Sequence, residues 1–317
     1  MLAALVGLLS PLVDNDFRDS VREVVANVLI LGGATLDPEL EWRACRFRAG
    51  ANIADGNLDS ATADYEAIAD IASKCGSPDG DVVAKNGLAL VLHLRGNLPA
   101  AEARVRELIA IADARCSRAI RVRVRLNLGV VLGKRSRFEE ALSELEAALA
   151  LAETSRHEDE FGDRESIVAD IAFTYVQLGN VEAARRIYTA LTFSAKTIRI
   201  ATGARINLMH IAGLRGDSQS VRQLQGELNA RPMQTRLQVD YLLTLGVACN
   251  AIGDIEQAKI ALERCLDLAS RTGFGQYLIE ADRRIKRISE LLSSGDEAKT
   301  HRFVDRVVGR AVRALAD

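Results

Sequence analysis

The sequence predicts an all-α protein that folds as an α-solenoid, a right-handed superhelix of about six helix pairs with capping helices at both ends. Three observations predict this fold. The 317-residue chain is rich in Ala and Leu but contains only 5 Pro, a composition that favours helices. A turn signal recurs at nearly regular intervals, and stretches with helical apolar periodicity flank each turn.

Residues 1–37 are expected to form an N-terminal helical cap or degenerate repeat, with a turn at residues 31–33 and an extended exit before Pro38. The first apolar stretch has neither the basic segment nor the cleavage site of a signal peptide. It is also too short to span a bilayer. We therefore expect this stretch to be a packed amphipathic helix.

Residues 38–272 are expected to form six helix pairs, because a turn signal occurs six times in this region. The turns are centred on residues 56, 96, 136, 179, 216 and 253, so that successive steps are 40, 40, 43, 37 and 37 residues. Five of these positions are Gly, and the third is Ser136. Glycine readily adopts the positive φ that ends a helix, and the Asn or Asp that follows most of these glycines can cap the next helix.

Small residues recur on both helices of a pair, where we expect the two helices to touch. In the third pair these residues are Gly129 and Ala141, while Leu132 and Leu145 are large enough to fill the space toward the next pair. The same small positions recur in the other pairs as Ala89 and Ala101, Ala172 and Ala184, and Gly246 and Ala258. Only the fifth pair has larger residues there, Met209 and Val221.

This pattern resembles the tetratricopeptide repeat family, whose first helix carries Leu-Gly and Tyr and whose second helix carries Ala and Phe. The resemblance covers roughly residues 38–272. The period near 40 is similar to that of the longer repeats in bacterial regulators, such as the sensor arrays of maltose-activator-like ATPases and peptide-pheromone receptors, and in kinesin light chains. The resemblance implies a scaffold that binds a protein or peptide in bacterial signal transduction or transcriptional regulation.

Residues 273–317 are expected to form two C-terminal capping helices, at 275–293 and 297–315. A repeat array leaves an apolar face at each end, and helices with a polar outer side normally cover that face. On the second helix, four arginines recur at helical spacing, which indicates a solvated outer face or, as an alternative, a ridge for phosphate or an acidic partner. They are Arg302, Arg306, Arg310 and Arg313.

The charged and reactive residues indicate no catalytic site. The 4 His and 5 Cys lack metal-ligand spacing, and the chain has no glycine-rich phosphate-binding motif. We therefore expect a non-enzymatic protein without catalytic residues, metal or cofactor. The formal net charge of −2 argues against direct contact with nucleic acid, and the isolated, apolar-flanked cysteines favour a cytoplasmic location. No membrane partner is expected.

In the family that the chain resembles, the first helices line a concave groove that holds the ligand. The resemblance therefore implies that groove positions on the first helices bind the partner. Their mixed polarity suits hydrogen bonding to a peptide backbone, although a groove filled only with water would also be polar. A small-ligand-sensing solenoid and an RNA-binding helical repeat remain as alternatives, and a homo-oligomer is left open. The implied binding residues are Arg43, Arg46, Asn86, Leu90, His93, Arg123, Asn127, Lys134, Phe173, Gln177, Asn207, His210, Asp240 and Asn250.

Overall fold

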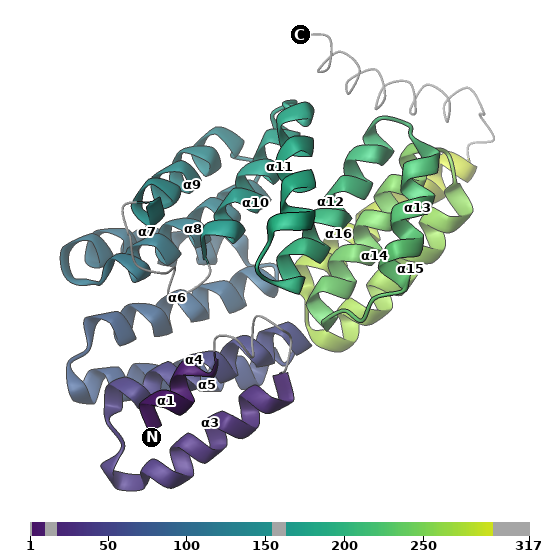
Figure 1. The fold of residues 1–317 in the computed structure, drawn as a ribbon. Coiled ribbons are helices and arrows are strands. Elements are labelled where there is room, and N and C mark those ends of the chain that lie inside the picture. The colour runs from purple at the N-terminus through teal and green to yellow at the C-terminus, as the bar shows by residue number, and fades with distance from the viewer. Residues whose placement is uncertain (1, 10–17, 154–162, 294–317) are drawn as a thin grey trace. The chain divides into compact units, whose positions relative to one another are not determined.

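A computed structural model describes residues 2–9, 18–153 and 163–293, and the protein is all-α (Figure 1). The helices within these residues follow one another with short connections. In chain order they are α1 (Leu2–Gly7), α3 (Arg18–Gly32), the 3₁₀ helix η1 (Gly33–Thr35), α4 (Pro38–Asp55), α5 (Leu58–Cys75), α6 (Pro78–Leu94), α7 (Leu98–Arg115), α8 (Arg118–Lys134), α9 (Phe138–Glu153), α10 (Asp163–Gln177), α11 (Val181–Ser194), α12 (Ile198–Leu214), α13 (Ser218–Asn229), α14 (Thr235–Ala251), α15 (Ile255–Thr272) and α16 (Gly275–Ser293).

The chain divides into two compact units. Unit 1 comprises Met1–Asp170 with Lys196–Arg199, and unit 2 comprises Ile171–Ala195 with Ile200–Asp317. The boundary therefore falls within α10. Unit 1 contains the helix pairs α4/α5, α6/α7 and α8/α9, and unit 2 contains α11, the pairs α12/α13 and α14/α15, and α16.

All six predicted turns adopt the left-handed backbone conformation that ends a helix. Ser136 is the one non-glycine residue with positive φ in the described part of the chain. Two positions later the second helix of each pair begins, and in several pairs the intervening Asn or Asp caps it, as Asn97 does by accepting a hydrogen bond from the Ala100 N–H. The φ values are 83° at Gly56, 90° at Gly96, 61° at Ser136, 87° at Gly179, 71° at Gly216 and 82° at Gly253.

The small positions mark the closest approach of the two helices in a pair, which confirms that prediction. A Cβ added to Gly129 would lie 2.6 Å from Leu145 Cγ, and one added to Gly246 would lie 2.5 Å from Leu262 Cγ. Both distances are far below van der Waals contact. In the fifth pair, Met209 and Val221 are both fully buried, so the larger residues are also part of the core.

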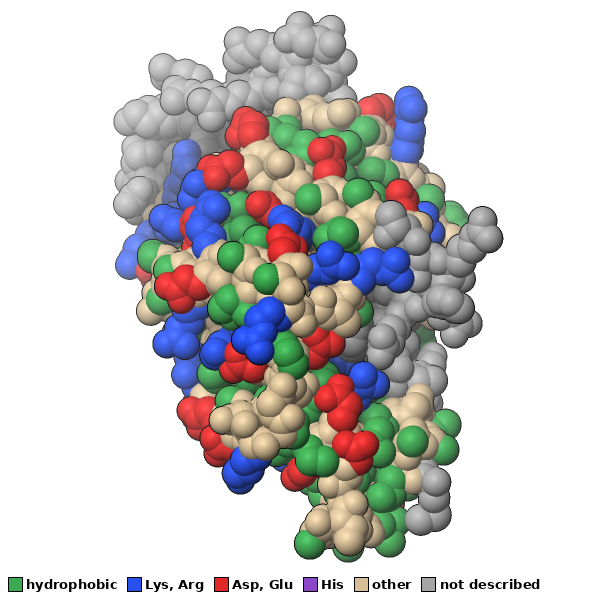
Figure 2. Space-filling view, turned by 90° about the vertical axis from the view of Figure 1, so that its left-hand side faces the viewer, with side chains coloured by type: hydrophobic (Ala, Val, Ile, Leu, Met, Phe, Trp, Pro, Cys, Tyr) green, Lys and Arg blue, Asp and Glu red, His purple; other side chains and the backbone are tan. Residues whose placement is uncertain are grey.

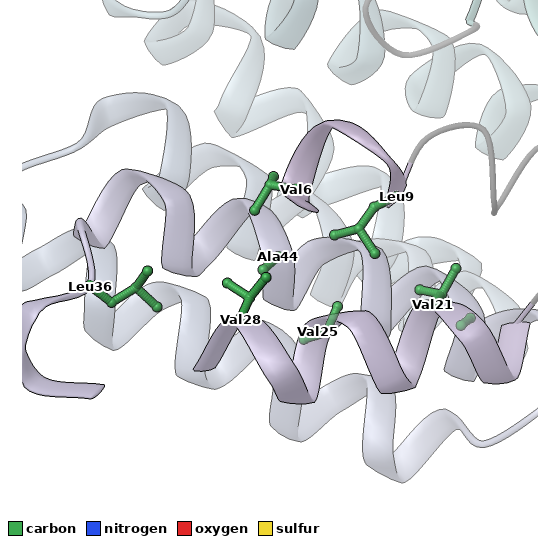
Figure 3. Close-up of a cluster of buried hydrophobic side chains, with 8 residues drawn as sticks. Val6, Leu9, Val21, Val25, Val28, Leu36 and Ala44 are labelled. Carbon is green, nitrogen blue, oxygen red and sulfur yellow. The ribbon is translucent and has the colours of Figure 1, made fainter. Parts of the chain in front are cut away.

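The N-terminal helices form an apolar cluster with the first helix pair (Figure 3). The predicted helix at the start of the chain is α1, which contacts α3 and α4. The predicted turn is also present, because α3 ends at Gly32 and Gly33 has φ 47°. Burial of this cluster stabilises the end of the array by removing apolar surface from water. Its buried members are Val6, Leu9, Val21, Val25, Val28, Leu36, Ala44 and Ala51.

At the other end of the chain, the first predicted capping helix is α16. It contacts α14 and α15, and it buries Tyr277, Ala281 and Ile288. The second predicted helix, 297–315, lies outside the described residues together with its four arginines.

First helices lie next to one another on the inner side of each unit. In unit 1, α4 contacts α6 and α6 contacts α8, and in unit 2, α14 contacts α16. Among the described residues, no two successive second helices are in comparable contact. Helix pairs that are closer on one side than on the other curve toward the closer side. The first helices therefore line the concave side of each unit.

A buried carboxylate links neighbouring pairs in unit 1. The Glu102 side chain on α7 is 6% exposed and pairs with three arginines. Arg106 Nε lies 2.7 Å and Arg137 Nη1 2.6 Å from Glu102 Oε1, and Arg135 pairs with Oε2. Burial alone would raise the pKa of Glu102, but the hydrogen bonds from Arg106 and Arg135 outweigh it and lower the pKa. Because Arg135 and Arg137 belong to the next turn, the network joins the second pair to the third.

Candidate functional site

In unit 1 the predicted groove residues converge around Tyr65, a buried residue of α5. Burial raises the pKa of the Tyr65 hydroxyl, and the charges of Arg123 and Arg46 act to lower it. These arginines lie on α8 and α4, so cations from two first helices approach the same phenol. Helix α6 packs on this ring, because a Cβ added to Gly87 would lie 2.1 Å from Tyr65 Cε1.

Asn86, next to Gly87 on α6, is one of the two most deeply buried polar residues of this group, with His93. Its side chain is 3% exposed, and within the described residues its amide oxygen has no hydrogen-bond partner. A buried polar atom without a partner destabilises the protein by about 1–3 kcal/mol unless it is satisfied. The Asn86 oxygen is therefore an unsatisfied acceptor within a first helix, one of the helices that line the concave side of unit 1.

The other predicted residues of unit 1 differ in exposure. Arg43 pairs with Glu39, at 3.2 Å between Arg43 Nε and Glu39 Oε1, and its guanidinium lies 5.6 Å from the Trp42 ring centroid. His93 is as deeply buried as Asn86, at 3% exposure, but unlike the Asn86 oxygen its side chain interacts within the fold. The remaining three are partly exposed on α6 and α8. They are Leu90, Asn127 and Lys134.

In unit 2 the structure gives several predicted residues internal partners. Asp240 on α14 accepts a hydrogen bond of 2.6 Å from the Tyr277 hydroxyl on α16, so it ties these two first helices together. Asn207 donates to the Gly203 carbonyl within α12, at 3.0 Å. On α10, Phe173 is partly exposed and Gln177 is exposed.

A pocket of about 250 Å³ opens between α14 and α16 in unit 2. Asn250, a predicted groove residue, lies in its wall. Apolar or small residues and polar or charged residues both contribute, so the pocket is amphipathic. The apolar or small ones are Gly246, Val247, Leu262 and Ile288, and the others are Asn250, Glu280, Arg283, Arg284 and Arg287.

Repeat spacing explains why α16 contributes to this pocket. His210, Val247 and Arg284 are separated by steps of 37 residues, the period of the last repeats, so they occupy the same position on α12, α14 and α16. Arg287 is likewise 37 residues after Asn250. Helix α16 therefore continues the row of first helices, and sequence reasoning missed Glu280, Arg284 and Arg287 because it stopped the repeat at residue 272. One more step of 37 residues would have found them.

Arginine dominates the electrostatics of the pocket wall. Glu280 pairs with Arg284, at 2.7 Å between Arg284 Nε and Glu280 Oε1, and with Arg283, at 3.3 Å between Nη1 and Oε2. Glu280 is the one carboxylate among the described residues that line the pocket, where three arginines also lie. Burial and the charge of Arg284 lower the pKa of His210 to about 4, so the imidazole is neutral near pH 7.

Metal and membrane sites are not found in the part of the chain that the structure describes. No group of three or more His, Cys, Asp or Glu residues is placed to hold a metal ion there. Nor is any helix of that part both long and apolar enough to cross a bilayer. The described first helices carry amides, guanidinium groups and apolar side chains.

Comparison with known proteins agrees with the helical repeat architecture. Residues 239–272, which span most of α14 and all of α15, match the tetratricopeptide repeat family. No curated protein sequence matches the chain.

Solved structures extend the similarity to most of the chain. NprR in complex with its cognate peptide NprX has a TM-score of 0.60 at 14% identity, covering 92% of this chain and 86% of NprR. The apo form of the quorum sensor NprR from B. thuringiensis has a TM-score of 0.55 at 14% identity, covering 96% and 97%. Apo RapI has a TM-score of 0.55 at 12% identity, covering 85% and 93%. At these identities the likeness concerns the fold. With its repeated turns, small-residue contacts and matched repeat, the chain is a helical repeat protein of the tetratricopeptide type.

Proposed function

We propose that this protein is a non-enzymatic regulatory scaffold that binds a peptide or an extended protein segment on the concave side of its first helices. One observation carries the proposal: first helices lie next to one another on the inner side of each unit, and one of them, α6, holds Asn86, whose side-chain oxygen lacks a partner among the described residues. A peptide backbone supplies donors and acceptors along its length, and an asparagine amide can pair with both.

The similarity to NprR supports this proposal, because NprR with a TM-score of 0.60 was solved in complex with its cognate peptide NprX. By analogy of fold we extend peptide binding to this chain and place it in bacterial signal transduction or transcriptional regulation. The groove residues named from the sequence are the proposed contacts, together with Glu280, Arg284 and Arg287. A cytoplasmic location fits this role.

The pocket size favours a peptide over a metabolite as the ligand. Sites for small molecules typically enclose about 300–1,000 Å³, whereas the pocket in unit 2 has about 250 Å³. That volume suits one residue of a longer ligand. RNA-binding surfaces are normally continuous and basic, whereas on the face that Figure 2 shows acidic side chains are interspersed with basic ones, so that face is not suited to RNA.

Selection from a peptide library tests the proposal. The full chain would be used to enrich a random octapeptide library, and the affinity of an enriched peptide would be measured by fluorescence anisotropy. We expect micromolar or tighter binding, and at least a tenfold weaker affinity for Asn86→Ala, because the variant removes a hydrogen bond worth about 1.4 kcal/mol or more.

Gln219→Ala is the matched control, since Gln219 is an exposed amide residue on α13, a second helix. This variant should bind the peptide within twofold of the wild type. If no peptide is enriched, or if Asn86→Ala and Gln219→Ala bind as tightly as the wild type, the proposed groove function is wrong.

A further inference from the structure

We infer that the pocket between α14 and α16 is an anion site that holds a carboxylate of the bound peptide. The inference rests on the proposed peptide-binding function and adds the chemistry of one subsite. It also assigns a binding role to α16, the helix that the sequence predicts to be only a cap.

The position of the charged residues along α16 builds one face. Glu280, Arg284 and Arg287 are four and then three residues apart, so they lie on the same side of the helix. Arg283 also lines the pocket. Successive turns of α16 thus present guanidinium groups to the pocket.

Glu280 positions the guanidinium groups of Arg283 and Arg284 without using all of their donors. It accepts from Nε and Nη2 of Arg284 and from Nη1 of Arg283. Each guanidinium has five N–H donors in a planar fork that matches a carboxylate. A second carboxylate that enters the pocket can therefore be bound by arginines whose orientation is already fixed, and preorganisation of this kind reduces the entropy lost on binding.

The rest of the wall fits the remainder of an acidic residue. Asn250 on α14 can donate to the same carboxylate through its amide. Val247, Leu262 and Ile288 provide apolar contacts for methylene groups. His210, with a pKa of about 4, adds no positive charge near neutral pH, so the selectivity for an anion comes from the arginines.

Two sources could supply the carboxylate: an Asp or Glu side chain, or the C-terminus of the peptide. Two octapeptide libraries distinguish them, one with free C-termini and one with amidated C-termini. If a side chain supplies the carboxylate, selection on the wild-type chain should enrich Asp or Glu at least fivefold at one position in both libraries. If the C-terminus supplies it, at least ten times more peptide should be retained from the free-carboxylate library than from the amidated library. The first result assigns a side chain, and the second assigns the terminus.

The double variant Arg284→Gln/Arg287→Gln should abolish this preference while still selecting peptides. The matched control is Arg271→Gln/Lys286→Gln, which removes the same charge at two exposed positions that do not line the pocket. It should preserve the acidic preference of the wild type. Circular dichroism would confirm that each variant is folded. If a variant does not fold, the two peptide selections on the wild-type chain still test the inference.

The outcomes separate this inference from the proposed function. If the wild type enriches peptides with no acidic residue or free-terminus preference, the anion site is wrong while peptide binding stands. The anion site is also wrong if the folded arginine variant keeps the preference. If neither library yields a bound peptide, the proposed function fails and the anion site fails with it.

Discussion

At the scale of single residues, the missing Cβ atom of a glycine sets the distance between the helices of a pair. Gly129 and Gly246 occupy the same position in the third and sixth pairs, and each faces a leucine of the second helix, Leu145 or Leu262. This feature follows from the sequence because steric exclusion depends on residue size alone. The same reasoning could not predict that Gly87 contacts Tyr65 of the preceding pair, since that contact depends on how successive pairs stack.

Substitution of Gly129 tests this steric requirement. Gly129→Ala should lower the free energy of unfolding by about 1–3 kcal/mol, because the new methyl group overlaps with Leu145. Gly50→Ala is the control, since Gly50 is also helical but nothing lies within 4 Å of its added Cβ. It should be neutral or stabilising by up to about 1 kcal/mol through helix propensity. Equal effects in urea unfolding would contradict the close approach.

His210 gives a pH dependence whose sign follows from its pKa. In the folded chain this pKa is about 4, below the unfolded value of 6.5. As the pH falls, the unfolded chain takes up the proton first, so stability that is present above about pH 6.5 is lost as the pH falls toward 4.

The variant His210→Gln isolates the contribution of His210 to the pH dependence of stability. When the pH falls from 7 to 4.5, the free energy of unfolding should decrease more for the wild type than for His210→Gln. The difference should be on the order of 1–2 kcal/mol, a value that allows for the partial exposure of His210. Urea titrations at the two pH values measure both chains. A variant whose stability falls as much as that of the wild type would show that His210 titrates normally in the folded state.

At the scale of helices, the contacts between successive pairs depend on buried polar groups as well as apolar surface. The Glu102 network joins α7 to the turn between α8 and α9. Apolar packing alone is weakly directional, whereas three arginines on one buried carboxylate require a particular placement of the next pair. We infer that this network helps to fix the stacking geometry of the second and third pairs.

Removing the charge of Glu102 tests this role. Glu102→Gln should lower the free energy of unfolding by about 1–3 kcal/mol, because three arginines lose their shared charged acceptor. The control is Glu140→Gln, which loses pairs with Arg106 and Arg137 at a side chain that is 50% exposed. The control should have a much smaller effect. If both variants are equally stable, the buried network does not hold the pairs together.

Most helices could be predicted from the sequence, because the turns depend on local chemistry. Glycine at five of the turns and Ser136 at the third all have positive φ. The role of α16 was harder to predict. Its charged outer positions are typical of a solvated cap, and only the steps of 37 residues from His210 to Val247 and Arg284 show that it extends the row of first helices.

Only part of the candidate site could be predicted from the sequence. Residue spacing identifies which side chains share a face, and Asn250, which it assigns to the groove, lies in the wall of the pocket in unit 2. Spacing does not show which polar groups find partners inside the fold. Asp240 therefore proved to bind Tyr277, and the burial of Asn86 and His93 became apparent only from the packing of α6.

In the molecule as a whole, the repetition of the helix pairs determines which surface can recognise an extended peptide. Each pair places its first helix on the inner side of a unit, so polar residues of successive repeats share one surface. An extended peptide also repeats its backbone groups at regular intervals, so it can meet several first helices in turn. Within each unit, partner-binding residues should consequently lie on the first helices, and the second helices should remain uninvolved.

Hydrogen–deuterium exchange of the full chain, with and without a library-selected peptide, shows which helices the peptide covers. We expect the peptide to slow exchange mainly in the first helices α6, α8, α14 and α16. The second helices α7, α9 and α15 should change little, because they are on the outer side of their units. Slower exchange confined to the second helices, with the first helices unchanged, would contradict recognition on the concave side.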